Sequence, residues 1–142
     1  CGSIYGNTEN ACEILAACLA DRGVQGVRLY DVSRTHASEL VAEAFRCSHL
    51  VFASATYNGE IFTPMENLLR DLKSHGLRNR TVGLIENGTW AAAAGKQMAE
   101  LLGTMKDMTI LDGAVSLKSS VKNTQRQGLE ALAGAMAADI LA

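Results

Sequence analysis

The sequence lacks the features that mark several classes of protein. No apolar run approaches the roughly 20 residues that a membrane-spanning helix requires. Basic and acidic residues nearly cancel, 13 against 15, for a formal net charge of −2. Because a nucleic-acid-binding face usually needs clustered basic residues, we do not expect nucleic acid as a partner. The lack of a long apolar run likewise argues against a membrane.

Cysteine pairs with metal-binding or redox spacing are also missing. The four cysteines are Cys1, Cys12, Cys18 and Cys47, and none forms a C-x-x-C pair. The sequence therefore gives no support for a zinc ribbon or a thioredoxin-like site. We interpret all four as reduced, buried, small apolar residues, which is typical of a cytoplasmic protein.

The composition present is that of one globular domain. The chain has 142 residues, of which 48% are apolar and 20% are charged. A chain of this length buries roughly 68% of its unfolded surface, so it needs neither disulfides nor metal to fold. Disorder is not expected, because it requires low hydrophobicity combined with high net charge.

Helical and extended segments alternate along the sequence. Apolar residues recur at helical spacing in five segments, namely 8–22, 36–47, 63–72, 91–105 and 124–140. Short apolar runs predict strands at 27–32, 49–56, 81–85 and 108–117, the last interrupted near Asp112 and Gly113. This alternation predicts an α/β fold, a doubly wound parallel five-stranded sheet with helices on both faces.

Local signals indicate two helix boundaries. Thr63 is predicted as an N-cap, Pro64 suits the first helical position, and Glu66 completes a capping box. Gly23 is predicted to end the first helix, because glycine commonly follows the last helical residue.

The first strand of such a sheet is missing from the pattern. Only Cys1 and Gly2 precede the first candidate binding loop, so four strands are visible where five are expected. The sequence also does not begin with Met. We therefore expect it to be part of a longer protein that supplies a first strand ending near Cys1.

Three segments at predicted strand ends carry polar side chains, and ligands of open α/β sheets bind beyond such ends. The first is 3–8, with hydroxyls, an amide and backbone N–H groups leading into a helix, which is a ready site for an anion. It has neither the lysine of a Walker motif nor the glycines of a dinucleotide fingerprint. A neutral, hydroxyl-rich loop suits a phosphate monoester such as that of flavin mononucleotide (FMN).

The second and third segments are 54–59 and 86–90. Each contains an Asn-Gly step, which tolerates positive φ, and each carries one aromatic residue. Alone, either is an ordinary turn beside a core aromatic. Together with the first segment they predict a flavin site in which Tyr57 and Trp90 flank the ring and the Asn58–Gly59 peptide meets its edge.

The segments SIYGNTE at 3–9, FASATYNGEIFTPMENLL at 52–69 and IENGTW at 85–90 resemble the flavodoxin-like domain of flavodiiron proteins. The resemblance spans the chain from Ser3 to the last helix, with Ala55 where that family commonly has proline. It implies the following cofactor-binding residues, in chain order: Ser3, Ile4, Tyr5, Gly6, Asn7 and Thr8 at the phosphate; Ser54, Thr56, Tyr57, Asn58 and Gly59 at the ribityl chain and ring edge; Glu86, Asn87, Gly88, Thr89 and Trp90 on the other side.

The resemblance also implies a function and partners. The domain would bind FMN and pass electrons to a diiron centre, in a metallo-β-lactamase-like domain of the parent protein, that reduces nitric oxide or dioxygen. It implies a rubredoxin-like or NAD(P)H-dependent electron donor and a homo-oligomeric parent. The diiron ligands are not expected in this sequence, because His36, His49 and His75 form no H-x-H-x-D pattern.

Other functions remain open at this point. A free-standing NAD(P)H:quinone oxidoreductase and a mobile flavodoxin share the expected fold, although mobile flavodoxins are typically more acidic. A doubly wound domain without a cofactor is a third alternative. The isolated segment is not expected to reduce nitric oxide or dioxygen at a metal, and no catalytic residue is assigned, because Ser3 and Ser54 have no adjacent histidine.

Overall fold

The computed structural model describes residues 1–6, 8–57, 60–87, 93–111, 115–117 and 123–142. The five helices formed by these residues are α1 (Glu9–Asp21), α2 (Ala37–Arg46), α3 (Thr63–Ser74), α4 (Ala94–Gly103) and α5 (Asn123–Leu141). The strands are β1 (Gly2–Gly6), β2 (Arg28–Asp31), β3 (His49–Tyr57), β4 (Glu60–Ile61), β5 (Arg80–Asn87), β6 (Met108–Ile110) and β7 (Val115–Leu117).

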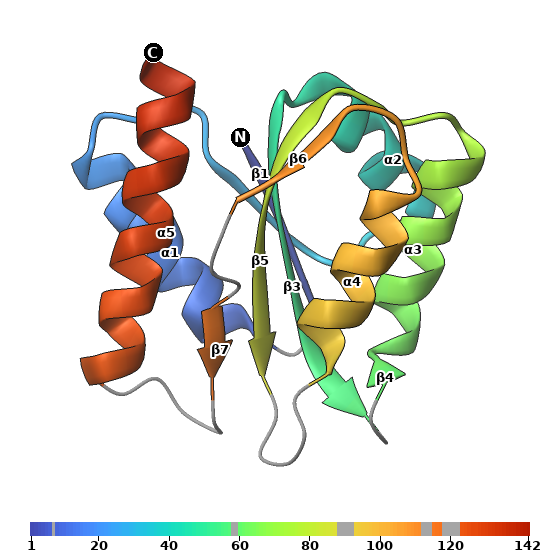
Figure 1. The fold of residues 1–142 in the computed structure, drawn as a ribbon, viewed down its shortest axis with the longest axis horizontal. Coiled ribbons are helices and arrows are strands. Elements are labelled where there is room, and N and C mark those ends of the chain that lie inside the picture. Colours follow the sequence, from blue (N-terminus) through green and yellow to red (C-terminus); the bar gives the residue numbers. More distant parts are fainter. Residues whose placement is uncertain (7, 58–59, 88–92, 112–114, 118–122) are drawn as a thin grey trace.

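The main sheet is parallel and doubly wound. Its strand order is β2-β1-β3-β5-β6, and β7 pairs with β5 further along the same edge (Figure 1). The short β4 adds an antiparallel ladder to the end of β3, which the sequence pattern did not predict. The predicted α/β class and the doubly wound, five-stranded parallel sheet are confirmed.

Helices cover both faces of the sheet. In Figure 1, α1 and α5 lie on one face and α2, α3 and α4 on the other. Strand residues alternate between the two layers: Leu50 and Phe52 belong to the core under α2–α4, whereas Val51 and Ala53 belong to the core under α1 and α5. This alternation decides which helix each side chain at the end of a strand can reach.

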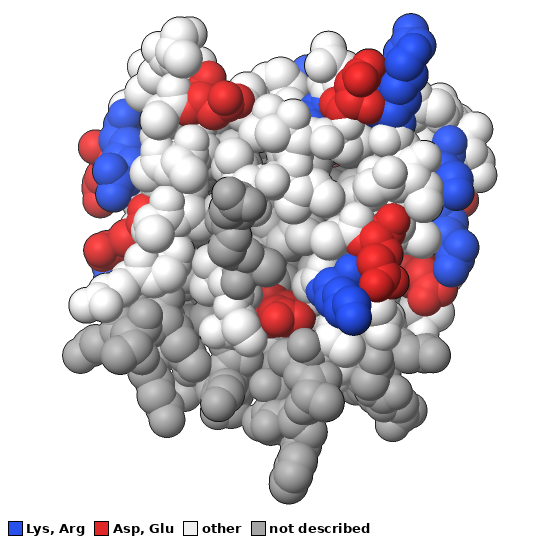
Figure 2. Space-filling model, viewed as in Figure 1, with Lys and Arg blue, Asp and Glu red and all other residues white. Residues whose placement is uncertain are grey.

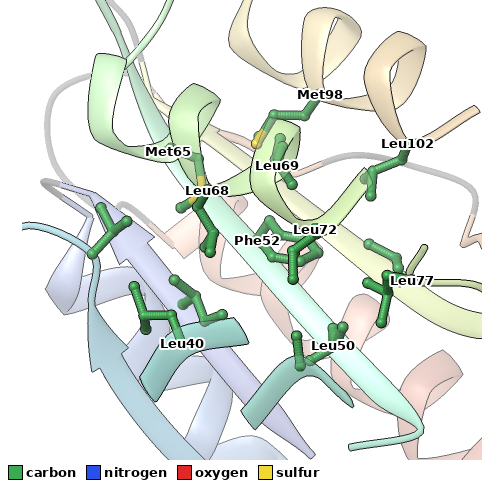
Figure 3. Packing of buried hydrophobic residues seen from close by; sticks show 14 of the residues in the cluster. Leu40, Leu50, Phe52, Met65, Leu68, Leu69, Leu72, Leu77, Met98 and Leu102 are labelled. Atoms are coloured by element: carbon green, nitrogen blue, oxygen red, sulfur yellow. The ribbon is translucent and has the colours of Figure 1, made fainter. Parts of the chain in front are cut away.

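The larger core cluster lies between β3 and the helices α3 and α4. Figure 3 shows Phe52 facing Leu69 and Leu72 of α3, with Met98 and Leu102 of α4 close by. All five side chains are completely buried. Their burial holds α3 and α4 against the sheet.

Residues Gly2–Gly6 form a strand and not the loop expected from the sequence. They occupy the position between β2 and β3, with Ile4 level with Tyr30 on one side and Phe52 on the other. Pairing on both sides satisfies the backbone N–H and C=O groups of this buried segment, which outweighs its turn-like composition. The expectation that this position would be filled by a strand from upstream sequence is therefore wrong.

Two details at helix ends differ from the capping prediction. Phe62, and not Thr63, is the N-cap of α3, a shift of one residue. Glu66 pairs with Arg70 one turn later, at 3.3 Å, instead of closing a capping box. The end of α1 is as predicted, since Gly23 follows the C-cap with φ of +86°.

The last strand is split, as the sequence predicted, into β6 and β7. All four cysteines are free; Cys12 and Cys18 are buried, but Cys1 and Cys47 are only partly so, which corrects the expectation that all four are interior. None of the helices formed by the described residues has the length and apolar character needed to span a membrane.

Candidate functional site

The predicted site residues lie within or just after the carboxyl-terminal parts of β1, β3 and β5, which run parallel and finish at one edge of the sheet (Figure 1). Six of them lie outside the described residues: Asn7, Asn58, Gly59, Gly88, Thr89 and Trp90. The backbone of Tyr57 ends β3, and its side chain is likewise outside the description. The predicted ring contacts therefore stay predictions.

Ser3, Thr8 and Cys12 form one polar group, which we call the α1 cluster. Ser3 lies inside β1 and is 1% exposed, while Thr8 is the N-cap of α1 and is 4% exposed. Among the described residues, neither hydroxyl has a hydrogen-bond partner other than the Cys12 thiol, and Thr8 makes no side-chain cap to its own helix. Unpaired buried hydroxyls are uncommon in folded proteins, so each needs an explanation.

The Cys12 thiol is the one group among the described residues that can hydrogen bond to these hydroxyls. Burial raises the pKa of Cys12 to about 11, while the hydroxyls of Ser3 and Thr8 lower it because both can hydrogen bond to the thiolate. Burial has the larger effect on this pKa, so the thiol is neutral near pH 7. A neutral thiol forms only weak hydrogen bonds, so it stabilises the two hydroxyls little.

Tyr5 points to the same face of the sheet and is 9% exposed. Burial raises the pKa of its phenol, and the negative charges of Glu9 and Asp31 raise it further. The phenol is therefore neutral, and it donates a hydrogen bond to the Glu9 carboxylate at the start of α1. Tyr5 and Thr8 are the predicted residues of the first segment that lie where the chain enters this helix.

Ile4 and Gly6 point to the opposite face and serve packing. Ile4 belongs to the core under α2–α4. A Cβ on Gly6 would lie 2.5 Å from Cδ2 of Phe62, so even alanine would force the Phe62 ring to move. Both residues shape the edge of the sheet, but neither offers a side chain to a ligand.

Ser54 is fully buried and its hydroxyl is already engaged. It donates to the carbonyl of Ala55 at 2.9 Å and accepts from the N–H of Phe62 at 3.2 Å. The same N–H also donates to the Ala55 carbonyl at 3.1 Å. Ser54 therefore fixes the return of the chain from β3 to α3.

Thr56 and Glu86 meet at the start of α4, and with Ala94 and Gly95 they form the α4 cluster. The N–H of Gly95 donates to Oε2 of Glu86 at 2.7 Å, and that of Ala94 donates to Oγ1 of Thr56 at 3.4 Å. Glu86 thus binds a helix N-terminus, where a negative charge is favourable. Asn87 follows it, level with Ala55 of β3.

The structure therefore divides the predicted residues between two faces of the sheet. Ser3, Tyr5 and Thr8 adjoin α1, whereas Ser54, Thr56 and Glu86 adjoin α3 and α4. Three residues that complete these groups were missed: Cys12, Phe62 and Gly95. Only helical spacing could have placed Cys12 under Thr8, since four residues bring two side chains onto one face of a helix.

Charge gives no single-sign patch on the face seen in Figure 2. There, basic and acidic side chains of the described residues lie interspersed along both flanks. The mixture agrees with the net charge of −2 and differs from a surface built for long-range steering of a charged partner.

Comparison with protein-family profiles gives no match, and comparison with curated proteins gives none either. Solved structures do match. Rubredoxin oxygen:oxidoreductase from Desulfovibrio gigas matches 99% of the chain with a TM-score of 0.87 and 23% identity. A flavodoxin from the domain Archaea matches all of both chains with a TM-score of 0.84 and 16% identity. The chain has the flavodoxin-like fold.

This flavodoxin-like fold occurs in proteins of two lengths. The chain spans 35% of the Desulfovibrio gigas oxidoreductase and 36% of the flavodiiron protein from Giardia intestinalis, which matches it with a TM-score of 0.88 and 12% identity. It spans the whole of the archaeal flavodoxin. The low identities establish the fold alone.

In a doubly wound sheet such as the flavodoxin-like fold, ligands bind where the strand order changes direction. Here that point lies between β1 and β3, because β2 follows on one side and β5 on the other. Thr8 follows β1 and Thr56 lies near the end of β3. The two predicted threonines thus flank the place where this fold puts its ligand.

Proposed function

We propose that the chain is an FMN-binding electron-transfer domain that relays electrons to a diiron nitric oxide or dioxygen reductase domain elsewhere in a parent protein. One observation carries the proposal. The Thr8 hydroxyl is buried at the N-terminus of α1, beside the switch point of a flavodoxin-like sheet, and the neutral Cys12 thiol is its one partner among the described residues. An anion there would meet this hydroxyl and the first N–H groups of a helix.

The described residues fit the phosphate of FMN in part. Thr8 and the first turn of α1 offer neutral donors, and the pKa of Tyr5 keeps its phenol protonated. Ser3 carries a second buried hydroxyl next to Cys12 but lies deeper, inside β1. Ser54 supports the fold of the site, since both of its hydrogen bonds are made within the protein.

The remaining residues of the proposed site come from the sequence resemblance. Asn7, Tyr57, Asn58, Gly59, Asn87, Gly88, Thr89 and Trp90 would line the ribityl chain and the ring. FMN, when bound, supplies the electron transfer itself, and the protein supplies binding, orientation and the local electrostatics. No residue of this chain is proposed as a nucleophile or a proton-transfer catalyst.

The proposed partners follow from the larger relatives of similar fold. The chain spans about a third of the Desulfovibrio gigas protein, which is named as an oxidoreductase that acts between rubredoxin and oxygen. This supports a diiron metallo-β-lactamase-like domain in the parent protein and a rubredoxin-like or NAD(P)H-dependent donor. We further propose a cytoplasmic, homo-oligomeric parent.

A mobile flavodoxin is the second candidate. The observation that favours it is the match to the archaeal flavodoxin over the whole length of both chains. The two candidates share the cofactor and differ in the partner. A carrier would exchange electrons with separate proteins, whereas a tethered domain would do so with its own parent chain.

The test is a titration of the purified apoprotein with FMN. We expect flavin absorption bands to shift on binding and flavin fluorescence to change to a saturating value at one FMN per chain. Protein that neither contains nor binds FMN would overturn both candidates. Rapid NADPH oxidation with a quinone by this chain alone would instead indicate a free-standing reductase.

A further inference from the structure

Helix α4 begins without a cap of its own. Its N-cap is Ala93, which has no side-chain hydrogen bond to offer, and its first turn contains no acidic residue. Since the first N–H groups of a helix have no partner within it, these donors need acceptors from elsewhere. They find them on two neighbouring strands, at Thr56 of β3 and Glu86 of β5.

The two acceptors reach α4 because they lie on the same face of the sheet. Strand residues alternate, and Phe52 of β3 and Leu84 of β5 both belong to the core under α2–α4. Thr56 is four residues beyond Phe52, and Glu86 is two beyond Leu84, so both continue the same stripe. On this face of the sheet, the apolar Phe52 and Leu84 are followed by the polar Thr56 and Glu86 at the start of α4.

Gly95 leaves the space that the carboxylate occupies. A Cβ at this position would lie 2.8 Å from Oε2 and 3.0 Å from Cδ of Glu86. Any side chain there would push the carboxylate away from the N–H that it accepts from at 2.7 Å. Gly95 and Glu86 therefore depend on each other.

We propose that Glu86 and Thr56 are positioning residues that anchor the first turn of α4 to the ends of β3 and β5, and that Glu86 does not bind the flavin directly. The inference rests on the proposed function. Oε2 of Glu86 accepts from Gly95, so this bond joins the two ends of the segment 87–94, which carries predicted flavin residues. Breaking this bond would let the start of α4 move relative to the end of β5, so the predicted flavin residues would be positioned less precisely and FMN would bind less tightly.

The anchor is tested first in the apoprotein, by hydrogen exchange at the amide of Gly95. Glu86→Ala removes the acceptor, and we expect Gly95 to exchange at least about tenfold faster, because a charged acceptor makes a strong hydrogen bond. Glu86→Gln keeps an acceptor oxygen and should give an intermediate rate. Glu100→Ala, an exposed carboxylate on the same helix, is the matched control and should change nothing.

The positioning role is tested by FMN affinity. Glu86→Ala and Gly95→Ala break one anchor from its two sides, so each should raise the dissociation constant by a similar factor, about tenfold, and the double variant should be no worse than either. Glu86→Gln should restore most of the affinity. Gly103→Ala, where a Cβ meets nothing within 4 Å, is the control for the added methyl group.

The outcomes separate this inference from the proposed function. Wild-type protein that binds no FMN overturns the proposed function. Unchanged Gly95 exchange in Glu86→Ala overturns the anchor, whatever the affinity. Faster exchange with unchanged FMN affinity overturns the positioning role, and a loss of affinity in Glu86→Ala that Gly95→Ala does not reproduce would show direct contact of Glu86 with the flavin.

Discussion

The ring of Phe62 fills the space beside Gly6. A Cβ on Gly6 would lie 2.5 Å from Cδ2 of Phe62 and 3.2 Å from Cγ1 of Val32. Phe62 is also the N-cap of α3, and its N–H closes the turn from β3 through Ser54 and Ala55. Gly6 thus connects the end of β1 with the start of α3 by close packing, independently of any ligand.

Gly6→Ala should lower the free energy of unfolding by about 1–3 kcal/mol, the usual cost of adding a methyl group to a filled core. Urea unfolding would measure it. Gly103→Ala provides the control, since it adds a methyl group in open space within a helix and should be neutral or slightly stabilising. Phe62→Leu combined with Gly6→Ala should recover part of the loss; no recovery would contradict the contact.

Much of this fold could be predicted from the sequence, because apolar periodicity reports burial directly. The stripe of Leu68, Leu69 and Leu72 predicted α3, and these residues are buried in the core. The run at 49–56 predicted a strand buried on both faces, and β3 contacts both core clusters. These patterns depend only on which side chains leave water.

The first strand could not be predicted in the same way. Ser3 and Gly6 have the composition of a turn, and only the neighbouring strands β2 and β3 make the extended form favourable. The role of Glu86 was equally hidden, because its partner Gly95 lies nine residues away and glycine carries no side-chain signal. Interactions between residues far apart in the sequence do not change the periodicity of apolar residues, so the sequence pattern does not reveal them.

Thr8→Val should affect the apoprotein and FMN binding in different ways. Among the described residues the buried hydroxyl has only the neutral Cys12 thiol, a weak hydrogen-bonding group, as a partner, so replacing it with a methyl group should leave the free energy of unfolding unchanged or raise it slightly. FMN binding should weaken by about 1–3 kcal/mol, because a hydrogen bond to a charged phosphate is lost. Isothermal titration calorimetry and urea unfolding measure the two effects. Equal FMN affinity would refute a phosphate contact at Thr8.

Asp139 should stabilise the fold in a pH-dependent manner. Its Oδ2 lies 2.5 Å from Nε2 of His49, and that hydrogen bond lowers the pKa of Asp139. Burial opposes this effect, whereas the charge of His49 and a hydrogen bond from Thr81 add to it by smaller amounts. A carboxylate whose pKa is lower when folded stabilises above its unfolded pKa of about 3.9, and the stabilisation disappears as the pH falls through the folded value.

Asp139→Asn should therefore be less stable than the wild type at pH 7, and the difference should shrink as the pH falls below about 4. Urea unfolding across this range would measure it. Asp107→Asn is the matched control, because Asp107 has φ of +53°, a conformation that asparagine also tolerates. A stability difference for Asp139→Asn that is independent of pH would show that ionisation of Asp139 is not its source.

Cys12 should give the opposite pH dependence. Burial raises its pKa to about 11, so at pH 8 only about one thiol in a thousand is ionised in the folded protein, and thiol reagents should reach it only after unfolding. Because the folded pKa is raised, this contribution to stability is present below the ordinary thiol pKa of about 8.5 and is lost as the pH rises towards 11.

Lysines and tyrosines also titrate in this range, so the comparison of the wild type with Cys12→Ala isolates the effect of the thiol. Relative to that variant, the wild type should lose up to about 3 kcal/mol between pH 8.5 and 11. Cys18→Ala removes another buried thiol of α1 and controls for the lost packing; an identical pH dependence in the two variants would contradict a special environment for Cys12.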